Sequence, residues 1–121
     1  MNVERRQQLL VEAIDGMNAR DLEAYGRMVS PDVVVHSPGS TEPSIGRGAR
    51  LEWVAGLLAA FPDAVVTIVG SFYAGDRGCV EDTFAGTHTG PLATADGGAV
   101  PPTNARVAFP YVITYTYGDD D

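Results

Sequence analysis

The hydrophobic period of this chain changes once, and that change constrains the fold more than any single motif. Up to residue 61 apolar residues recur at helical spacing, as Leu10, Ile14 and Met17 do in the first segment. From residue 64 onward apolar residues alternate with other residues, which is the period of a half-buried strand. Helices first and strands afterwards indicate an α+β protein, in which a helical layer covers an antiparallel sheet.

The first half of the chain predicts three helices and one short strand. We expect helices over residues 3–19, over 22–28 behind an N-cap at Asp21, and over 48–61. The β-branched run "DVVVHS" at 32–37 predicts a short strand, and a polar loop leads from it to the third helix.

The second half predicts three long strands, over residues 64–74, 78–89 and 105–117. A tight turn at 74–77 joins the first two, and a Gly- and Pro-rich connection at 90–103 joins the last two. Because no helix separates these strands, we expect a curved antiparallel meander that closes over the helices. The closed side of such a sheet commonly holds a pocket.

Length and charge limit the classes of function. The chain has 121 residues, enough for one domain with a single core, and a formal net charge of −8. This charge argues against nucleic acid and anionic membrane surfaces as partners, because both attract Lys and Arg. Cys79 is the only cysteine, so no internal disulfide is expected. With no secretory signal and no apolar run near roughly 18 residues, we expect a cytoplasmic protein.

Alternation also sorts the strand residues into two faces. In the last strand the odd positions are large and apolar or aromatic, namely Val107, Phe109, Tyr111, Ile113 and Tyr115. That face is expected to point inward. In the middle strand Val80 and Phe84 mark the inward face, which also carries Asp82 and His88. A β-bulge at Gly86 would move His88 to the opposite face, and the sequence leaves this open.

Three stretches of the sequence carry a resemblance to a known family. They are "VVVHSPG…GRGARLEWV" (33–54), "AFPDAVVTIVGSFYAGDR" (60–77) and "GTHTGPL…PPTNARVAF" (86–109). In order and spacing they are similar to the SnoaL-like polyketide cyclases of the nuclear transport factor 2-like superfamily. The resemblance implies an α+β cone of three N-terminal helices on a curved, mainly antiparallel sheet that encloses an apolar cavity. It also implies a homodimer and, as in characterised members, ring closure by aldol condensation without a cofactor.

Two departures from the family pattern bear on the site. In the family a further strand follows the last long one and can supply the catalytic carboxylate, whereas these residues end at "YGDDD". The single domain at 1–121 therefore either lacks its last strand, with a long unpaired sheet edge, or continues beyond Asp121. In addition, Glu81 and Asp82 stand where the family often has Arg followed by Trp. The family's active site does not transfer directly.

An aldol cyclisation needs a base for a proton next to a carbonyl and a donor for the enolate oxygen. We predict Asp82, His36 and His88 as catalytic residues. Asp82 is the expected base, because burial on an apolar face raises the pKa of a carboxyl group. Its alternative is a flipped or frayed strand that leaves it in solvent. His36 either lines the cavity or bonds backbone, and His88 either contacts ligand or belongs to a bend that "GTHTG" keeps for its geometry.

Aromatic residues form the predicted walls of the substrate pocket, namely Trp53, Phe84, Phe109, Tyr111 and Tyr115. Aromatic residues at strand spacing equally suit a plain core. The hydroxyls of Tyr111 and Tyr115 need partners if buried, and either could donate to an enolate oxygen. Glu81 is expected on the outer face, in solvent or in an interface. We expect no metal, because the histidines lack ligand spacing and the Asp119–Asp121 run suits a turn and tail.

These observations favour a cofactor-free cyclase or isomerase that acts on a hydrophobic, carbonyl-bearing, polyketide-like molecule. The alternative is a non-catalytic module that binds a small lipophilic ligand in the same cavity. Epoxide hydrolysis ranks last, because it needs an Arg beside paired carboxylates and the strand of Asp82 offers no suitable one. The expected partners are the small molecule and a second copy of the chain, with no nucleic acid and no membrane.

Overall fold

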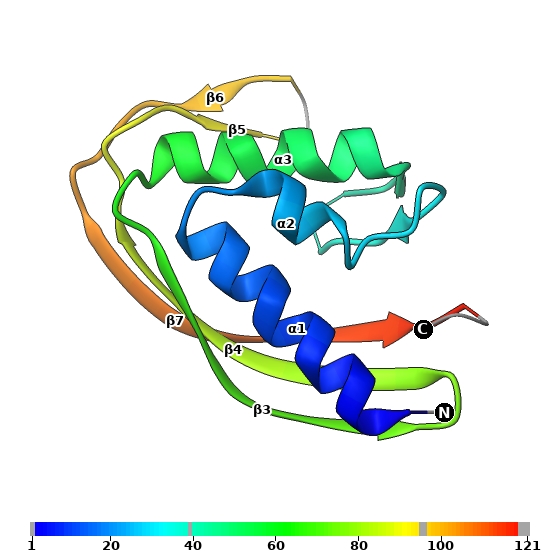
Figure 1. Cartoon of the computed structure of the whole chain (residues 1–121). Helices are drawn as coiled ribbons and strands as arrows, with labels where there is room; N and C mark the ends of the chain where they lie inside the picture. Colours follow the sequence, from blue (N-terminus) through cyan, green and yellow to red (C-terminus); the bar gives the residue numbers. More distant parts are fainter. Residues whose placement is uncertain (1, 39, 95–96, 119–121) are drawn as a thin grey trace. The chain divides into compact units, whose positions relative to one another are not determined.

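The computed structural model describes residues 2–38, 40–94 and 97–118. The chain divides into two compact units, the first made of Met1–Met28, Val65–Ala85 and Ala108–Asp121, the second of Val29–Ala64 and Gly86–Val107. Within the described residues, three helices and an antiparallel three-stranded sheet confirm the predicted α+β architecture (Figure 1). The interpretation of Asp119–Asp121 as a turn and tail lies outside the described residues. No helix in the described part of the chain is long and apolar enough to span a bilayer.

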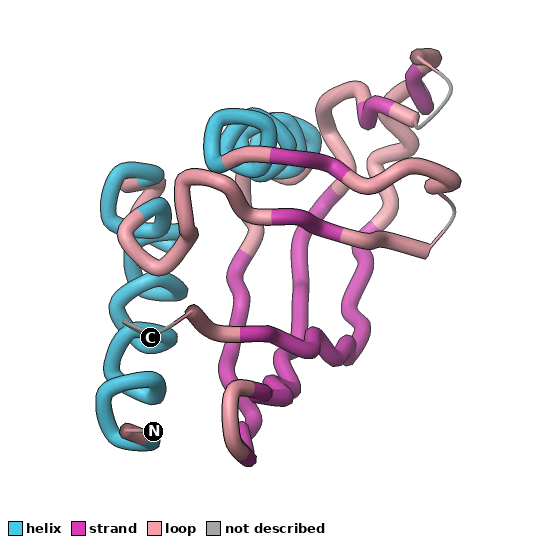
Figure 2. Tube along the Cα trace, turned by 90° about the vertical axis from the view of Figure 1, so that its right-hand side faces the viewer, coloured by secondary structure: helices cyan, strands magenta, loops and turns pink. Residues whose placement is uncertain are grey.

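Three long strands lie side by side in the order β3-β4-β7 (Figure 2). They are β3 (Val65–Ala74), β4 (Arg77–Thr87) and β7 (Arg106–Thr116), within a few residues of the predicted ranges. β3 and β4 pair antiparallel, with Ile68 opposite Asp82 and Tyr73 opposite Gly78. The pairing shifts between Ile68 and Gly70, so a β-bulge interrupts β3 there. Gly75 makes the tight turn, with a φ of +59° that suits glycine.

Helix α1 (Val3–Asn18) covers β3 in the first unit (Figure 1). Its buried face carries Leu10, Ile14 and Met17, the residues whose spacing predicts the helix. At its end, the Asn18 amide donates to the Val66 carbonyl and accepts from the Val66 N–H, both at 2.9 Å. One side chain therefore satisfies both polar groups of a strand residue and fixes the helix against the sheet.

Helix α2 (Leu22–Gly26) follows α1 and confirms the predicted N-cap. The Asp21 carboxylate accepts from the N–H of Ala24 at 3.1 Å. The helix ends at Gly26, two residues before the predicted end. Helices α1 and α2 pack closely at Gly16, where an added Cβ would lie 2.8 Å from the Cβ of Ala24.

Side chains of the sheet follow the predicted alternation. In β4 the positions of Val80, Asp82 and Phe84 are all buried, whereas the positions between them are more exposed. The odd positions of β7 are half-buried and the even ones exposed, with one exception. Phe109 has an odd position and yet is 47% exposed.

The second unit carries helix α3 (Arg47–Ala60) and two short ladders. β1 (Val34–Val35) pairs with β2 (Ser44–Ile45), and β5 (Leu92–Ala93) pairs with β6 (Ala99–Val100). The strand predicted at 32–37 is thus only two residues long. The long connection at 90–103 carries a ladder that the sequence analysis missed, closed by the hydrogen bond from Thr94 N–H to Gly98 O at 3.0 Å.

Candidate active site

Asp82 is the most unusual residue of the first unit. It lies on β4 between Val80 and Phe84, and its side chain is only 1% exposed. The hydroxyl of Tyr111 donates a hydrogen bond to this carboxylate. The oxygen Oδ1 has no hydrogen-bond partner. The alternative of a frayed strand, with Asp82 in solvent, is wrong, because the residue is 1% exposed and pairs with Ile68 in the β3–β4 ladder.

Burial raises the pKa of Asp82, and the hydrogen bond from Tyr111 partly opposes that rise by stabilising the carboxylate. An ionisable group with an unsatisfied oxygen and a raised pKa is typical of a functional site. One oxygen of the carboxylate is thus held by Tyr111, and the other is buried without a hydrogen-bond partner.

Aromatic rings flank this carboxylate within the first unit. Phe84 stacks on Phe109 with centroids 5.4 Å apart, and Phe109 contacts Tyr111 at 6.2 Å. Four predicted residues, Asp82, Phe84, Phe109 and Tyr111, therefore form one cluster. Tyr115 lies further along β7, where its ring is 6.1 Å from that of Tyr117. The predicted role of these rings as pocket walls stays a prediction.

His88 belongs to the second unit, where Phe61 and Thr103 contact its ring. The residue is 5% exposed, and its ring stacks on Phe61 with centroids 5.3 Å apart. Its Nδ1 lies 3.0 Å from the hydroxyl of Thr103, and its Nε2 is buried without a partner. The sequence does not predict the contact of Thr103 with His88, because a threonine in a Pro-rich loop carries no distinctive signal.

The segment "GTHTG" is shaped by packing within the second unit. The Asp63 carboxylate accepts from the N–H of Thr87 at 2.7 Å and from its hydroxyl at 2.8 Å, and these bonds lower the pKa of Asp63. A Cβ on Gly86 would lie 3.2 Å from that of Phe61, and one on Gly90 would lie 2.3 Å from the Ala59 carbonyl. Close packing therefore explains why glycine, which has no Cβ, occupies both positions.

Burial alternates without interruption through Gly86. Every even position from 78 to 88 is buried, so the alternation continues through Gly86 to His88. In the pairing of β3 with β4, the register shifts between Ile68 and Gly70. His88 is therefore buried like the other even positions, and its predicted place beside a cavity stays a prediction.

Two further predicted site residues lie at the surface of the second unit. His36 is exposed just after β1. Trp53 on α3 is 54% exposed, with the guanidinium of Arg50 4.7 Å from its ring centroid. Their roles in catalysis and substrate binding stay predictions. Among the described residues, no group of three His, Cys, Asp or Glu side chains is close enough to hold a metal ion.

Sequence comparison agrees with the motifs. A sequence model of the SnoaL-like polyketide cyclases matches residues 5–121. The chain belongs to the SnoaL-like polyketide cyclase family. The sequence resemblance is thus confirmed. No curated protein significantly matches this SnoaL-like chain.

Solved structures share the fold of this SnoaL-like chain. AclR of Streptomyces galilaeus, a candidate hydroxylase, is 25% identical with a TM-score of 0.77, over 98% of this chain and 83% of AclR. IdmH of Streptomyces antibioticus, a candidate polyketide cyclase, is 23% identical with a TM-score of 0.73, over 94% of this chain and 84% of IdmH.

A third solved structure is similar to this chain in fold. A protein of Catenulispora acidiphila with a ketosteroid isomerase-like fold is 17% identical with a TM-score of 0.71, over 93% of this chain and 78% of that protein. The SnoaL-like chain therefore shares its architecture with proteins of differently named activities, so its chemistry has to be argued from its own residues.

Proposed function

We propose that this chain is a cofactor-free enzyme that moves a proton on a hydrophobic, carbonyl-bearing molecule of the polyketide class. The observation that carries the proposal is the buried Asp82, whose Oδ1 has no partner while Tyr111 bonds the carboxylate. A buried oxygen without a partner is costly in a folded protein, and a ligand hydrogen would satisfy it.

In the proposed reaction Asp82 acts as the general base. Its Oδ1 takes a proton from a carbon next to a carbonyl, and the electron pair of that C–H bond forms an enolate. The enolate carbon attacks a second carbonyl of the same molecule, so a C–C bond forms and an alkoxide results. The proton on Asp82 then returns to that alkoxide. Atoms and charge balance, and the carboxylate is regenerated.

Burial helps this chemistry in two ways. It raises the pKa of Asp82, which makes the carboxylate a stronger base than an exposed one. The surrounding rings of Phe84 and Phe109 form an apolar environment, where a hydrogen-bond donor to the developing oxyanion is worth more than in water.

Exchange of carbon-bound hydrogen tests the proposal before the natural substrate is identified. Bicyclic and tricyclic ketones, β-tetralone first, are incubated with the protein in D₂O, and deuterium uptake next to the carbonyl is followed by NMR. We expect protein-dependent uptake that falls by about 10²-fold or more in Asp82→Asn, the range for loss of a general base. The control Asp15→Asn changes an exposed carboxylate of α1 and should exchange like the wild type.

The second candidate is a module that binds a lipophilic ligand without turnover. The same observation allows it, because Oδ1 of Asp82 could accept a hydrogen bond from a ligand hydroxyl. Binding of the ketones with no uptake above buffer, and equal uptake by Asp82→Asn, would favour the module over the enzyme.

A further inference from the structure

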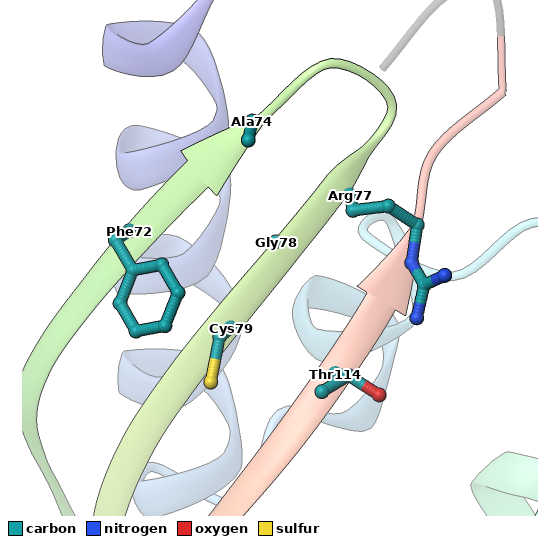
Figure 3. A pocket seen from close by; sticks show the side chains of 6 residues that line it. All are labelled: Phe72, Ala74, Arg77, Gly78, Cys79 and Thr114. Atoms are coloured by element: carbon teal, nitrogen blue, oxygen red, sulfur yellow. The ribbon is translucent and has the colours of Figure 1, made fainter.

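The face of the β3-β4-β7 sheet turned away from α1 carries a hollow of about 250 Å³ (Figure 3). All three strands line this outer hollow, through Phe72, Ala74, Arg77, Gly78, Cys79 and Thr114. Phe72 pairs with Cys79 across β3 and β4. Two residues on, Ala74 pairs with Arg77, so both pairs share one face of the sheet. Asp82 has the opposite parity on β4, so the outer hollow is separate from the proposed active site.

One side of the outer hollow is apolar. The ring of Phe72 borders it and is 71% exposed. Val112, two residues before Thr114 on β7, points to the same face and is 62% exposed. Aromatic rings prefer offset-stacked or edge-to-face contacts with other rings. An exposed ring beside a hollow therefore offers a planar apolar ligand a surface to pack on.

The other side of the outer hollow is polar. Figure 3 shows the Arg77 side chain extending over β7, on the side of Thr114 and away from the Phe72 ring. Within residues 2–38, 40–94 and 97–118, no group forms a hydrogen bond or an ion pair with the Arg77 guanidinium. A guanidinium has five donors in a planar fork that matches a carboxylate, and the Thr114 hydroxyl can donate once more. This side therefore suits a carboxylate.

The charges on this face determine which end of a ligand is anionic. Glu81 is exposed and shares the face with Arg77 through the period-two alternation of β4. Four residues along a strand span roughly 13 Å. An anion held at Arg77 is therefore separated from Glu81 by more than the screening length of about 8 Å at physiological salt. The carboxylate end of a ligand belongs at Arg77 and its uncharged ring at Phe72.

We propose that the outer hollow binds a small planar aromatic carboxylate, whose carboxylate pairs with Arg77 and whose ring packs on Phe72. The volume of about 250 Å³ is below the usual range of drug-sized ligand pockets, so it suits a molecule of one or two rings. The inference is independent of the proposed catalytic function, because it uses the other face of β4.

Naphthalene-2-carboxylate and naphthalene-2-carboxamide test the charge pairing, because they share a shape and differ in charge. Binding is followed by ¹⁵N–¹H NMR, where the backbone signals of Phe72, Cys79 and Thr114 should shift. The carboxylate should bind about three- to fivefold more tightly than the amide, as expected for an exposed ion pair. Arg77→Gln should abolish this preference. The control Arg5→Gln, at an exposed position of α1, should retain it, as should Asp82→Asn.

Alkylation of Cys79 provides a second readout, because it is the only cysteine of the chain and lines the outer hollow. Saturating naphthalene-2-carboxylate should slow the reaction of Cys79 with iodoacetamide, and Phe72→Ala should reduce that protection. Equal affinities for the two compounds, a preference that survives Arg77→Gln, or unchanged alkylation would each overturn the proposal. A Cys79 that iodoacetamide does not reach in the free protein would also overturn it, because something else then covers the hollow.

Discussion

The hydroxyl of Tyr111 on β7 donates a hydrogen bond to the Asp82 carboxylate on β4, while Oδ1 of the same carboxylate has no partner. The sequence analysis predicts Asp82 as a base and Tyr111 as a pocket wall or a donor to an enolate oxygen, and the structure adds the hydrogen bond between them. The hydrogen bond from Tyr111 stabilises the charged carboxylate, and the other oxygen of Asp82 has no hydrogen-bond partner. This relationship makes the pH dependence of the site testable.

Replacing Tyr111 with Phe should raise the pKa of Asp82 further. The hydrogen bond from Tyr111 lowers this pKa, and a bond to a charged group contributes about 1.5–3 kcal/mol. The acid limb of the pH–rate profile for deuterium exchange should therefore move to higher pH in Tyr111→Phe. A direct readout is the ¹³C NMR titration of the labelled Asp82 carboxyl. Tyr115→Phe, further along the same strand, should leave that titration unchanged.

Replacing Asp82 with Asn should stabilise the protein at neutral pH but not in acid. Burial raises the pKa of Asp82 above its ordinary value of 3.8 in the folded chain, so the folded state holds the proton to higher pH than the unfolded state. The stability that proton binding by Asp82 contributes is complete below the ordinary pKa and is lost as the pH rises through the raised pKa of the folded state. Urea unfolding at a series of pH values should show the gain of Asp82→Asn growing upward from about pH 4 and then levelling. A gain that is constant with pH would contradict this account.

Replacing Asn18 with Ala should weaken the attachment of α1 to β3. Asn18 makes two hydrogen bonds of 2.9 Å to the backbone of Val66, and their loss leaves a strand N–H and carbonyl unsatisfied. We expect a loss of about 1–3 kcal/mol in the free energy of unfolding, measured by urea denaturation. Gln8→Ala removes an exposed amide on the same helix that bonds Glu12, and should cost less than about 0.5 kcal/mol. Equal effects of the two changes would refute the role of Asn18.

Two glycines of the sheet should respond differently to alanine. A Cβ on Gly78 would lie 2.7 Å from the ring of Tyr73 and 3.0 Å from that of Tyr117, whereas one on Gly70 would meet nothing within 4 Å. Gly78→Ala should therefore destabilise the chain by about 1–3 kcal/mol through overpacking. Gly70→Ala should be neutral or slightly stabilising, because it lowers the entropy of the unfolded chain. Thermal melts of both variants provide the comparison.

Burial of Val80, Asp82 and Phe84 on one face could be read from the sequence, because alternation is a local property of each strand. The order and approximate bounds of the three helices and three long strands follow from the same kind of pattern, and the family follows from motifs along the chain. Periodicity identifies the face of a residue, but it does not identify the residue that will meet it there.

The tertiary structure decided everything that depends on contacts between distant segments. It gave Asp82 its hydrogen bond from Tyr111, placed a bulge in β3 after Ile68, and left His36 exposed. It also paired Asn18 with Val66, which no local pattern predicts. A hydrogen bond or a bulge depends on which backbone lies alongside, and only the packed chain brings those backbones together.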